Sequence, residues 1–507
     1  MDKNFILGGR YWVHAMYLLL AMFVVCFTGC KDDDDTGAGV YDPAKPVVVS
    51  DFAPKEGGAG QRLIIYGDNF GNDKSKVRVL IGGKEAVVVS VQNTAIYCFV
   101  PSQAYDGDIK VYVGEEGNEQ MGESATVFAY ERKMVVGTLC GYRNDRDDQG
   151  WKDGSFDECC GFRNDGYLKF DPKNHDHLYV CYDGADIQLL DLKNRMLSTP
   201  ISRSRFGNRR LRNLDFTTDG EYMLVATDCD EGTGNSPSVW IVTRDGNGVF
   251  SNDSPVQTIA SYKQCNGAAI HPVNGEMYFN SYERGQVFRM EMEDYFNTIA
   301  AGQQWDPTFD GRNYEELFTI QDTQWEFQIQ IHPTGKYAYI VVINQHYILR
   351  SDYNEAEKRF APPYVVAGES RSTGWTDAVG ASARLNRPYQ GVFVKNPEYA
   401  GQEDEYDFYF CDNQNHCIRC LTPDGRVTTY AGRGSASAVA DNNVWGTEDG
   451  DLREVARFRD PTGLAYDEET NTFYILDTVG RKIRTISMEG ENASTGDDTE
   501  SSDQSNE

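Results

Sequence analysis

The chain has 507 residues, of which 12% are aromatic and 25% charged, and its formal net charge is −30 at pH 7. This length leaves room for two or three domains, and the aromatic content can fill sizeable cores. The strong negative charge argues against nucleic acid as a partner, because binding a polyanion needs local positive charge that replaces the released counterions.

The first thirty residues have the pattern of a secretory signal. Lys3 and Arg10 precede an uncharged apolar segment over 15–27, which is too short to span a bilayer comfortably and ends in small residues. The sequence FTGC, which ends at Cys30, resembles a bacterial lipobox. The resemblance implies that residues 1–30 are a lipoprotein signal peptide and that Cys30 carries lipid in the mature protein. The alternatives are a plain signal peptide or an anchor helix.

An acidic, flexible linker is expected over 31–45. Lys31 is followed by four aspartates, which resembles the acidic export tag of surface lipoproteins in Bacteroides-type bacteria. The alternative is a solvated spacer. The two resemblances together imply a protein at the cell surface, attached to the outer membrane through acylated Cys30 and not through a transmembrane helix.

Residues 46–130 predict a small antiparallel sandwich. Short runs rich in valine and isoleucine alternate with clusters of glycine, proline, asparagine and aspartate. Pro54, the pair Gly57-Gly58 and the segments IIYGDNFG, VLIGG and CFVPS resemble the immunoglobulin-like IPT/TIG domain. The resemblance implies a spacer or platform in front of a larger domain. A binding role for the sandwich itself is the alternative.

Repeats dominate the rest of the chain, 131–487. Passages that begin at Val135, Val365 and Thr428 share a strand, a small-residue turn, a tryptophan followed closely by an acidic residue, and a new strand. In a second pattern, seen in CDNQNHCIRCL and LDTVGRKIRTI, an aromatic strand ends in a polar turn and returns as a strand. Both patterns resemble NHL repeats, which implies a six-bladed β-propeller. The expected blades begin near Asp165, Arg212, Asn266, Phe327, Gln390 and Thr462.

The ring of blades is expected to close with a strand from its own N-terminal end. The last unit ends near Ser487 without an outer strand, whereas KMVVGTLCG at 133–141 is a strand with no unit before it. Pairing the two would remove an exposed sheet edge. The predicted fold class is therefore all-β, with an immunoglobulin-like (IPT/TIG) sandwich followed by a six-bladed NHL-type β-propeller. The tail, 488–507, is acidic and serine-rich, so we expect it to be disordered.

The sequence contains twelve cysteines. Cys26 leaves with the predicted signal peptide and Cys30 carries lipid, so the other ten are thiols or disulfides, and export permits pairing. Cys411 and Cys417 flank a five-residue turn and are candidates for a cross-strand disulfide. Cys417 and Cys420 are spaced like a CxxC motif, but residues three apart in a strand face opposite ways, so we expect no shared metal.

No catalytic motif stands out. The sequence has no GxSxG elbow, HExxH helix, Walker loop or dinucleotide fingerprint, so we assign no catalytic residue and no cofactor. His271 and His332 occupy the same Ile-His-Pro slot, which indicates a repeated strand-end turn. Metal ligation by this pair is the alternative, since NHL-type propellers include a lyase that uses a metal and histidines. We assign no metal site.

Residues suited to sugar recognition gather in the loops before the inner strands and at the starts of those strands. Sugar binding needs flat apolar faces for stacking and planar polar groups for bidentate hydrogen bonds. The candidate ligand-binding residues are Trp151, Arg163, Asn164, Asn213, Asn266, Gln328, Trp375, Arg387, Tyr389, Trp445, Arg459 and Asp460. The alternative is structural: the tryptophans pin their loops, and Asn213, Asn266 and Gln328 bind the backbone of a neighbouring blade.

Three functions remain open. The first is a non-catalytic surface lipoprotein that binds a neutral glycan, an organisation similar to the accessory lipoproteins of Sus-like uptake systems, whose partners are an outer-membrane transporter and its lipoprotein lid. The second is a polysaccharide lyase or hydrolase built on the propeller, and the third a scaffold that binds proteins of the uptake complex. We favour the first, because the chain has an export address, a stalk and a repeated head but no recognisable catalytic set.

Overall fold

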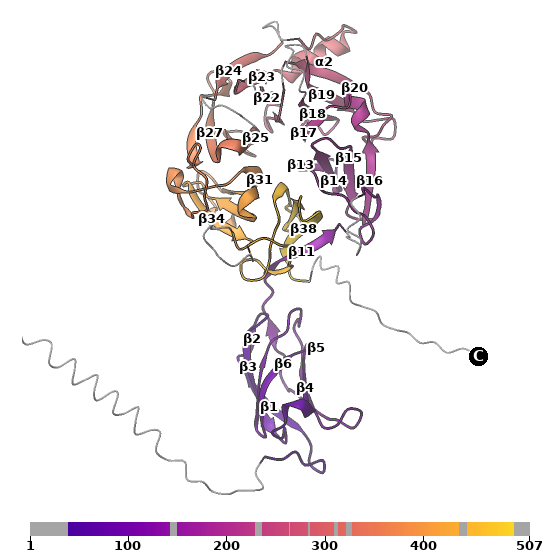
Figure 1. Cartoon of the computed structure of the whole chain (residues 1–507), viewed down its shortest axis with the longest axis vertical. Helices are drawn as coiled ribbons and strands as arrows, with labels where there is room; N and C mark the ends of the chain where they lie inside the picture. The colour runs from indigo at the N-terminus through magenta and orange to yellow at the C-terminus, as the bar shows by residue number, and fades with distance from the viewer. Residues whose placement is uncertain are drawn as a thin grey trace, which may run out of the picture. The chain divides into compact units, whose positions relative to one another are not determined.

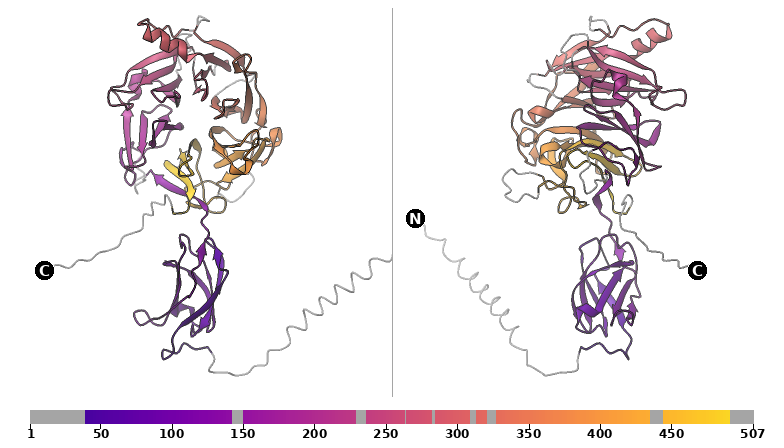
Figure 2. Two further views of the ribbon diagram at one scale, coloured as in Figure 1. Left: turned by 180° about the vertical axis from the view of Figure 1, so that it is seen from behind. Right: turned by 45° about the vertical axis from the view of Figure 1, so that its right-hand side comes forward.

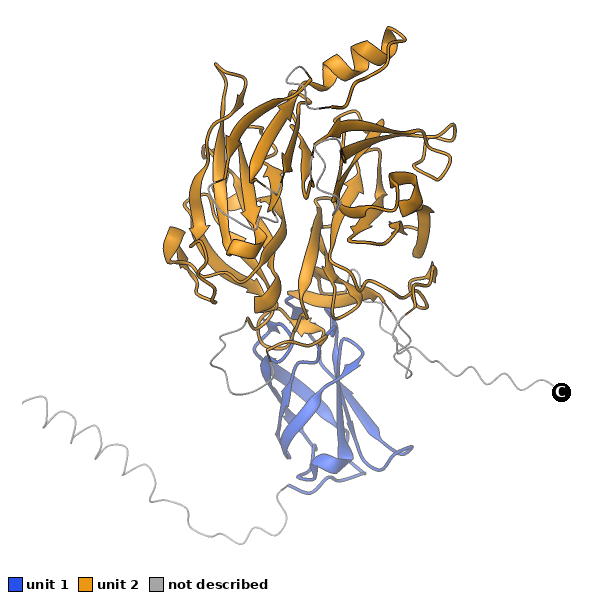
Figure 3. Cartoon of the chain, turned by 45° about the horizontal axis from the view of Figure 1, so that its top comes forward, with its two compact units in different colours: residues 1–132 blue, residues 133–507 orange. Residues whose placement is uncertain are grey.

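The structure is a computed structural model of the whole chain, and it describes residues 39–141, 150–228, 236–262, 264–281, 284–308, 313–320, 327–434 and 444–490. The chain divides into two compact units, unit 1 (1–132) and unit 2 (133–507), which Figure 3 shows in different colours. The predicted signal peptide, Cys30 and nearly all of the acidic tail lie outside the described residues.

Unit 1 contains two four-stranded antiparallel sheets and a two-stranded parallel pair. The sheets have the orders β1-β3-β7-β6 and β5-β4-β8-β9, and β10 pairs with β2. Strands such as β8, with the sequence IKVYV, bury alternate residues because successive side chains point to opposite faces. The bounds are β1 (Val48–Ala53), β2 (Glu56–Gly57), β3 (Arg62–Asp68), β4 (Val77–Ile81), β5 (Lys84–Glu85), β6 (Val87–Gln92), β7 (Ala95–Phe99), β8 (Ile109–Val113), β9 (Gln120–Glu123) and β10 (Ala129–Tyr130).

In the described part of unit 2, the longer strands form six antiparallel sheets of four or five strands. The first three sheets contain β12 (Gly154–Ser155), β13 (Gly166–Asp171), β14 (Asn174–Tyr182), β15 (Ile187–Asp191) and β16 (Met196–Ile201); β17 (Arg210–Phe216), β18 (Tyr222–Asp228), β19 (Pro237–Thr243) and β20 (Val256–Ser261); and β21 (Ala268–Ile270), β22 (Met277–Ser281), β23 (Gln286–Met290) and β24 (Glu315–Thr319). The last three contain β25 (Phe327–Ile331), β26 (Tyr337–Val342), β27 (Tyr347–Asn354), β28 (Arg359–Phe360) and β29 (Tyr364–Gly368); β30 (Ala378–Val379), β31 (Pro388–Lys395), β32 (Tyr406–Asp412), β33 (Cys417–Leu421) and β34 (Arg426–Ala431); and β11 (Met134–Cys140), β35 (Gly450–Asp451), β36 (Pro461–Asp467), β37 (Thr472–Asp477) and β38 (Lys482–Met488).

The six sheets of the described residues are arranged in a circle, which Figures 1 and 2 show from opposite sides. The innermost strand of each sheet contacts the innermost strand of the next, in the order β13, β17, β21, β25, β31 and β36, and β36 contacts β13 in turn. This arrangement is like that of a β-propeller. Each of these strands begins within two residues of the position expected from the repeats.

Strand β11 completes the last sheet. It runs antiparallel to β38, with Val136 opposite Ile486, and lies between β38 and the short strand β35. A hydrophobic cluster that includes Leu168 of β13 and Leu476 of β37 packs the first sheet against the last. The edge of β38 is therefore covered by β11, which removes a site for unwanted strand pairing.

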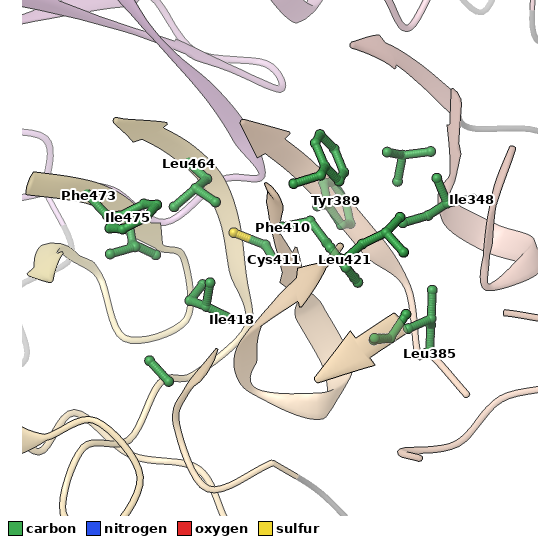
Figure 4. Packing of buried hydrophobic residues seen from close by; sticks show 14 of the residues in the cluster. Ile348, Leu385, Tyr389, Phe410, Cys411, Ile418, Leu421, Leu464, Phe473 and Ile475 are labelled. Atoms are coloured by element: carbon green, nitrogen blue, oxygen red, sulfur yellow. The ribbon is translucent and has the colours of Figure 1, made fainter. Parts of the chain in front are cut away.

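The middle strands of unit 2 are buried on both faces, because each sheet packs between two neighbours. Strands β26, YAYIVV, and β37, TFYILD, consist entirely of buried residues. This pattern differs from the alternation in unit 1 and explains why these segments are nearly continuous apolar runs. One cluster joins the fourth, fifth and sixth sheets through residues such as Ile348, Phe410 and Ile475 (Figure 4).

Helices contribute little to the described residues. The α-helix α2 follows β23 and packs Met292 and Tyr295 into the core of the second and third sheets. None of the helices described is both long and apolar enough to cross a membrane. The helices are α2 (Met292–Ala300) and the short 3₁₀ turns η1 (Lys74–Lys76), η2 (Arg203–Phe206), η3 (Ile343–Gln345), η4 (Gly380–Ser382), η5 (Pro397–Tyr399) and η6 (Asn413–Asn415).

The candidate disulfide between Cys411 and Cys417 is not formed, because both are buried free thiols. In the β32–β33 pair, Cys411 lies opposite Ile418, and Cys417 lies opposite Asp412. The two cysteines are therefore one step out of register and face opposite sides of the sheet. None of the nine cysteines in the described residues forms a disulfide.

Candidate functional site

A hollow of about 280 Å³ lies at the edge of the first sheet, beside the turn that joins β14 to β15. Its lining residues are Trp151, Gly184, Ala185, Asp186, Gln188, Thr199 and Arg203. We call this hollow the Trp151 pocket. Its volume is slightly below the range of about 300–1,000 Å³ that is usual for small-ligand sites.

The indole of Trp151 is fixed from one side. The ring of Tyr182 contacts it edge-on, with centroids 4.9 Å apart. A Cβ atom at Gly161 would lie 2.4 Å from Cε3 of Trp151, and Gly161 has a φ of +138°, so this position suits glycine. The guanidinium of Arg163 lies 5.9 Å from the ring centroid. Trp151 is half-buried, and the rest of its ring lines the pocket.

Polar groups of the same sheet surround the indole. Oη of Tyr182 donates to Oε1 of Gln188 at 2.9 Å, and Nε2 of Gln188 donates to Oδ1 of Asp153 at 3.2 Å. Oδ1 of Asp186 accepts the backbone N–H of Arg203 at 2.7 Å. Among the described residues, neither Oδ2 of Asp186 nor the guanidinium of Arg203 has a hydrogen-bond partner.

Within the described residues, the Trp151 pocket therefore combines a flat apolar surface with a carboxylate oxygen and a guanidinium that make no hydrogen bond. A planar guanidinium and a carboxylate can each form two hydrogen bonds with neighbouring hydroxyl groups. A ring that carries hydroxyls can stack on the indole while it makes these bonds. This is the chemistry of sugar recognition.

Of the predicted residues, Asn266, Gln328 and Tyr389 come together at the axis of the circle, where the inner strands begin. Oη of Tyr389 donates to Oδ2 of Asp165 at 2.8 Å and accepts from Nη2 of Arg387 at 3.0 Å. Burial raises the pKa of Tyr389, with the Asp165 charge as the next cause. The space between these residues is about 10 Å³, which is room for about one water and not for a sugar ring.

Asn164 and Asn213 hold backbone groups. Nδ2 of Asn164 donates to the carbonyl of Asp183 at 2.6 Å. Asn213 is buried, and its amide bonds both the N–H of Ala268, at 3.0 Å, and the carbonyl of Ala268, at 2.8 Å. The side chain of Asn213 thus joins β17 to β21 of the next sheet.

The other two predicted tryptophans are covered or bonded differently from Trp151. Nε1 of Trp375 donates to Oγ1 of Thr429 at 3.0 Å. Trp445 is 45% exposed, but the guanidinium of Arg459 lies 4.3 Å from its ring centroid. The backbone N–H of Asp460 donates to Nδ1 of His416 at 3.2 Å.

Two buried ion pairs recur at equivalent places and were not identified from the sequence. Arg419 donates to Oδ2 of Asp412 at 2.7 Å, and Arg484 donates to Oδ2 of Asp477 at 3.3 Å. All four side chains are fully buried. In both repeats an Asp ends one strand, and an Arg follows seven residues later in the next strand. This spacing is the signal that could have identified the two ion pairs.

Asp186, Gln188 and Arg203 were likewise missed. They lie outside the repeated pattern that contains the three tryptophans, in the polar turn after β14, in β15 and at the start of η2. Nothing in their local sequence distinguishes them from other surface residues.

Asp183, which lies beside the axis, should make the free energy of unfolding depend on pH. Burial raises the pKa of Asp183, but the adjacent Arg210 and Arg212 outweigh it and hold this pKa below 3.8. Asp183 accepts from Nε of Arg210 at 2.7 Å and from Nη1 of Arg212 at 3.0 Å. A lowered folded-state pKa gives stability above about pH 4 that is lost as the pH falls through the folded value.

We expect Asp183→Asn to cost on the order of 1 kcal/mol at pH 7 and progressively less from pH 4 downward. Urea unfolding of both proteins at several pH values measures this difference. Asp157→Asn, at an exposed position, is the matched control. A difference that stays constant between pH 7 and pH 3 would contradict the assignment.

The two histidines of the Ile-His-Pro slots make separate local contacts. Nε2 of His271 bonds the carbonyl of Gly335 at 3.0 Å, and Nδ1 of His332 bonds Oγ1 of Thr334 at 2.7 Å. Within the residues that the structure describes, no group of three or more His, Cys, Asp or Glu side chains is placed to hold a metal ion.

Both units are similar to known proteins. Residues 46–130 match the family model of the IPT/TIG domain. The fold is similar to a structure from Bacteroides thetaiotaomicron VPI-5482 that is provisionally named a phosphatase, with 57% identity, a TM-score of 0.81, and coverage of 89% of this chain and 99% of that one.

Two further structures are auxiliary nutrient binding proteins. The one from Bacteroides thetaiotaomicron VPI-5482 is 45% identical with a TM-score of 0.78, and the one from Bacteroides ovatus ATCC 8483 is 35% identical with a TM-score of 0.65. In each case 89% of this chain covers 100% of the other. A stretch of 345 residues is also 26% identical to Protein SUPPRESSOR OF QUENCHING 1, chloroplastic, of Arabidopsis thaliana, and spans only 26% of that protein.

Proposed function

We infer the function of this protein from one premise: the chain belongs to the family of Bacteroides proteins that includes these two auxiliary nutrient binding proteins. It acts as an accessory protein that binds a nutrient without transforming it. The nutrient is a carbohydrate, and the observation that carries this proposal is the Trp151 pocket, in which an indole lies beside unpaired groups of Asp186 and Arg203.

Unit 2 is proposed to be a six-bladed β-propeller of the NHL type, closed by β11. The pairing of β11 with β38 and the unbroken circle of inner strands support this architecture. The buried ion pairs of Arg419 and Arg484, which recur in successive repeats, support a common origin of these blades. Unit 1 then serves as the stalk.

The protein is proposed to act at the cell surface, anchored to the outer membrane by lipid on Cys30. The lipobox-like sequence FTGC and the four aspartates after Lys31 support this location. The partners in this proposal are a Sus-like outer-membrane transporter and its lipoprotein lid, which would receive the neutral glycan that the propeller binds.

Calorimetry against a panel of neutral glucans, mannans, xylans, galactans and fructans tests the proposed function. We expect saturable binding to one class and no release of reducing sugar. Because the relative with 57% identity carries a phosphatase name, the assay includes hydrolysis of p-nitrophenyl phosphate. Sugar release or phosphate release would replace the proposal by an enzymatic one, and binding to none of the glycans would reject it.

A further inference from the structure

A second cavity, of about 400 Å³, lies on the axis of unit 2, away from the Trp151 pocket. It is lined by the last residues of four inner strands, β13, β17, β21 and β25, whereas the cluster around Asp165 and Tyr389 lies where the inner strands begin. One space is lined by the first residues of inner strands and the other by their last residues, so the two spaces lie at opposite ends of the axis.

A buried hydrogen bond separates the two ends. Oη of Tyr167 on β13 donates to Oε1 of Gln330 on β25 at 3.1 Å. This bond orients the Gln330 amide. Among the described residues its buried Nε2 has no hydrogen-bond partner, and Gln330, which lines the cavity, is only 8% exposed. An unsatisfied buried donor is costly, and a ligand oxygen that reaches it recovers that cost.

A second donor lines the same cavity. Nζ of Lys169 pairs with Oδ1 of Asp215 at 2.8 Å. Asp215 also accepts the backbone N–H groups of Phe216 and Ile270, each at 2.9 Å, so both of its oxygens are bonded. The ammonium of Lys169 has three hydrogens, and among the described residues Asp215 is its one ion-pair partner. The Lys169 ammonium and Nε2 of Gln330 are therefore two hydrogen-bond donors that remain available in the cavity.

The wall also presents several apolar side chains. It includes Phe170, Phe216, Ile270, Ile329 and Ile331. A ligand for this space needs oxygen atoms that accept from Lys169 and Gln330 and a compact apolar body that covers the isoleucines and phenylalanines. Charge-assisted bonds to a carboxylate are the strongest that these donors can form.

We propose that this axial cavity is a second ligand site, which binds a small organic carboxylate with a compact apolar body. The site shares no lining residue with the Trp151 pocket, so it stands whether or not the protein binds a glycan. The ligand's carboxylate accepts from Lys169 and from Nε2 of Gln330, and its apolar part packs on the ends of β21 and β25.

Binding of sodium 2-naphthoate, measured by calorimetry on the full chain, tests the proposal. We expect a Kd below about 1 mM and at least about tenfold weaker binding of the neutral isostere 2-naphthalenemethanol. Gln330→Glu replaces the unpaired donor by an anion of the same shape and should weaken naphthoate binding at least about tenfold. Lys169→Met should remove the preference for the carboxylate.

Lys173→Met is the matched control, since Lys173 lies just beyond β13, is exposed and pairs with Glu221. It should bind naphthoate like the unaltered protein. Circular dichroism verifies that each variant is folded, and Lys169→Met decides the question if Gln330→Glu does not fold. Equal affinity for the carboxylate and the alcohol, or wild-type naphthoate affinity in a folded Gln330→Glu or Lys169→Met variant, would overturn the proposal. Failure of the glycan panel would leave this result unaffected.

Discussion

Replacing Trp151 with alanine is expected to weaken glycan binding at least about tenfold while the protein stays folded. A tryptophan that forms the floor of a ligand site typically contributes about 2 kcal/mol or more, which exceeds a factor of ten in Kd. The indole is held in place by Tyr182 and Gly161 before any ligand arrives, so little entropy is lost when a ring stacks on it. Calorimetry with the polysaccharide that binds best in the panel measures the loss.

Trp445→Ala is the matched control for this experiment. Trp445 belongs to the same repeated pattern as Trp151, but the guanidinium of Arg459 already lies on its ring, 4.3 Å from the centroid. We expect its affinity to stay within about twofold of the unaltered protein. Asp186→Asn and Arg203→Ala should each weaken binding, because they supply the unpaired polar groups of the pocket. Full affinity in a folded Trp151→Ala variant would remove the Trp151 pocket from the proposed function.

Replacing Arg484 with methionine is expected to lower the free energy of unfolding by about 3–5 kcal/mol. The guanidinium is fully buried and bonds Asp477, Asp449 at 2.5 Å, and the carbonyls of Arg457 and Glu448 at 2.9 and 2.8 Å. Methionine fills a similar volume but leaves the buried carboxyl group of Asp477 without its counter-charge, so that group must either hold a proton or stay ionised without a partner. Urea unfolding of full-length protein measures the loss.

The pH dependence separates this electrostatic cause from a packing defect. Burial raises the pKa of Asp477 to about 7, and Arg484 opposes that rise, so the pKa should be higher still in the variant. Both folded proteins keep a proton on Asp477 that the unfolded chain loses near pH 4, so both lose stability as the pH rises above that value. The loss ends near pH 7 in the unaltered protein and continues to higher pH in the variant. The destabilisation should therefore be smaller at pH 5 than at pH 8.

Two further variants complete this test. The double variant Arg484→Met with Asp477→Asn should recover part of the loss, because a neutral amide replaces the unpaired charge. Arg195→Met is the control, since its ion pair with Asp157 is exposed and spans 3.6 Å; we expect a cost of about 1 kcal/mol or less. A loss that does not change with pH would indicate that Arg484 acts through packing alone.

Local patterns in the sequence predicted much of the fold, because each repeat carries its own strand and turn signals. The residues at which inner strands were expected, such as Phe327 and Thr462, lie at or next to the observed starts of β25 and β36. The spacing of Cys411 and Cys417 made a disulfide between them a candidate, but it does not reveal the register of β32 and β33, which excludes the bond. One step of register places two cysteines on opposite faces.

The candidate site could be predicted from the sequence only in part. The repeated pattern predicted Trp151, Trp375 and Trp445 equally. A sequence pattern shows which residue type occupies a position, but it does not show which side chains pack against that residue. The structure separates them, with the ring of Trp445 under Arg459 and the ring of Trp151 beside a hollow.

The sequence by itself determined the mostly β composition, the IPT/TIG domain and the spacing of the repeats, because these depend on side-chain periodicity and turn residues close together in the chain. Only the tertiary structure decided which surfaces can receive a ligand. Asp186 and Arg203 meet beside Trp151, and Tyr167 meets Gln330 across the axis, through strand pairings and sheet packing that bring distant residues together. These contacts cannot be predicted from a local sequence pattern, because each depends on how the whole circle of sheets is packed.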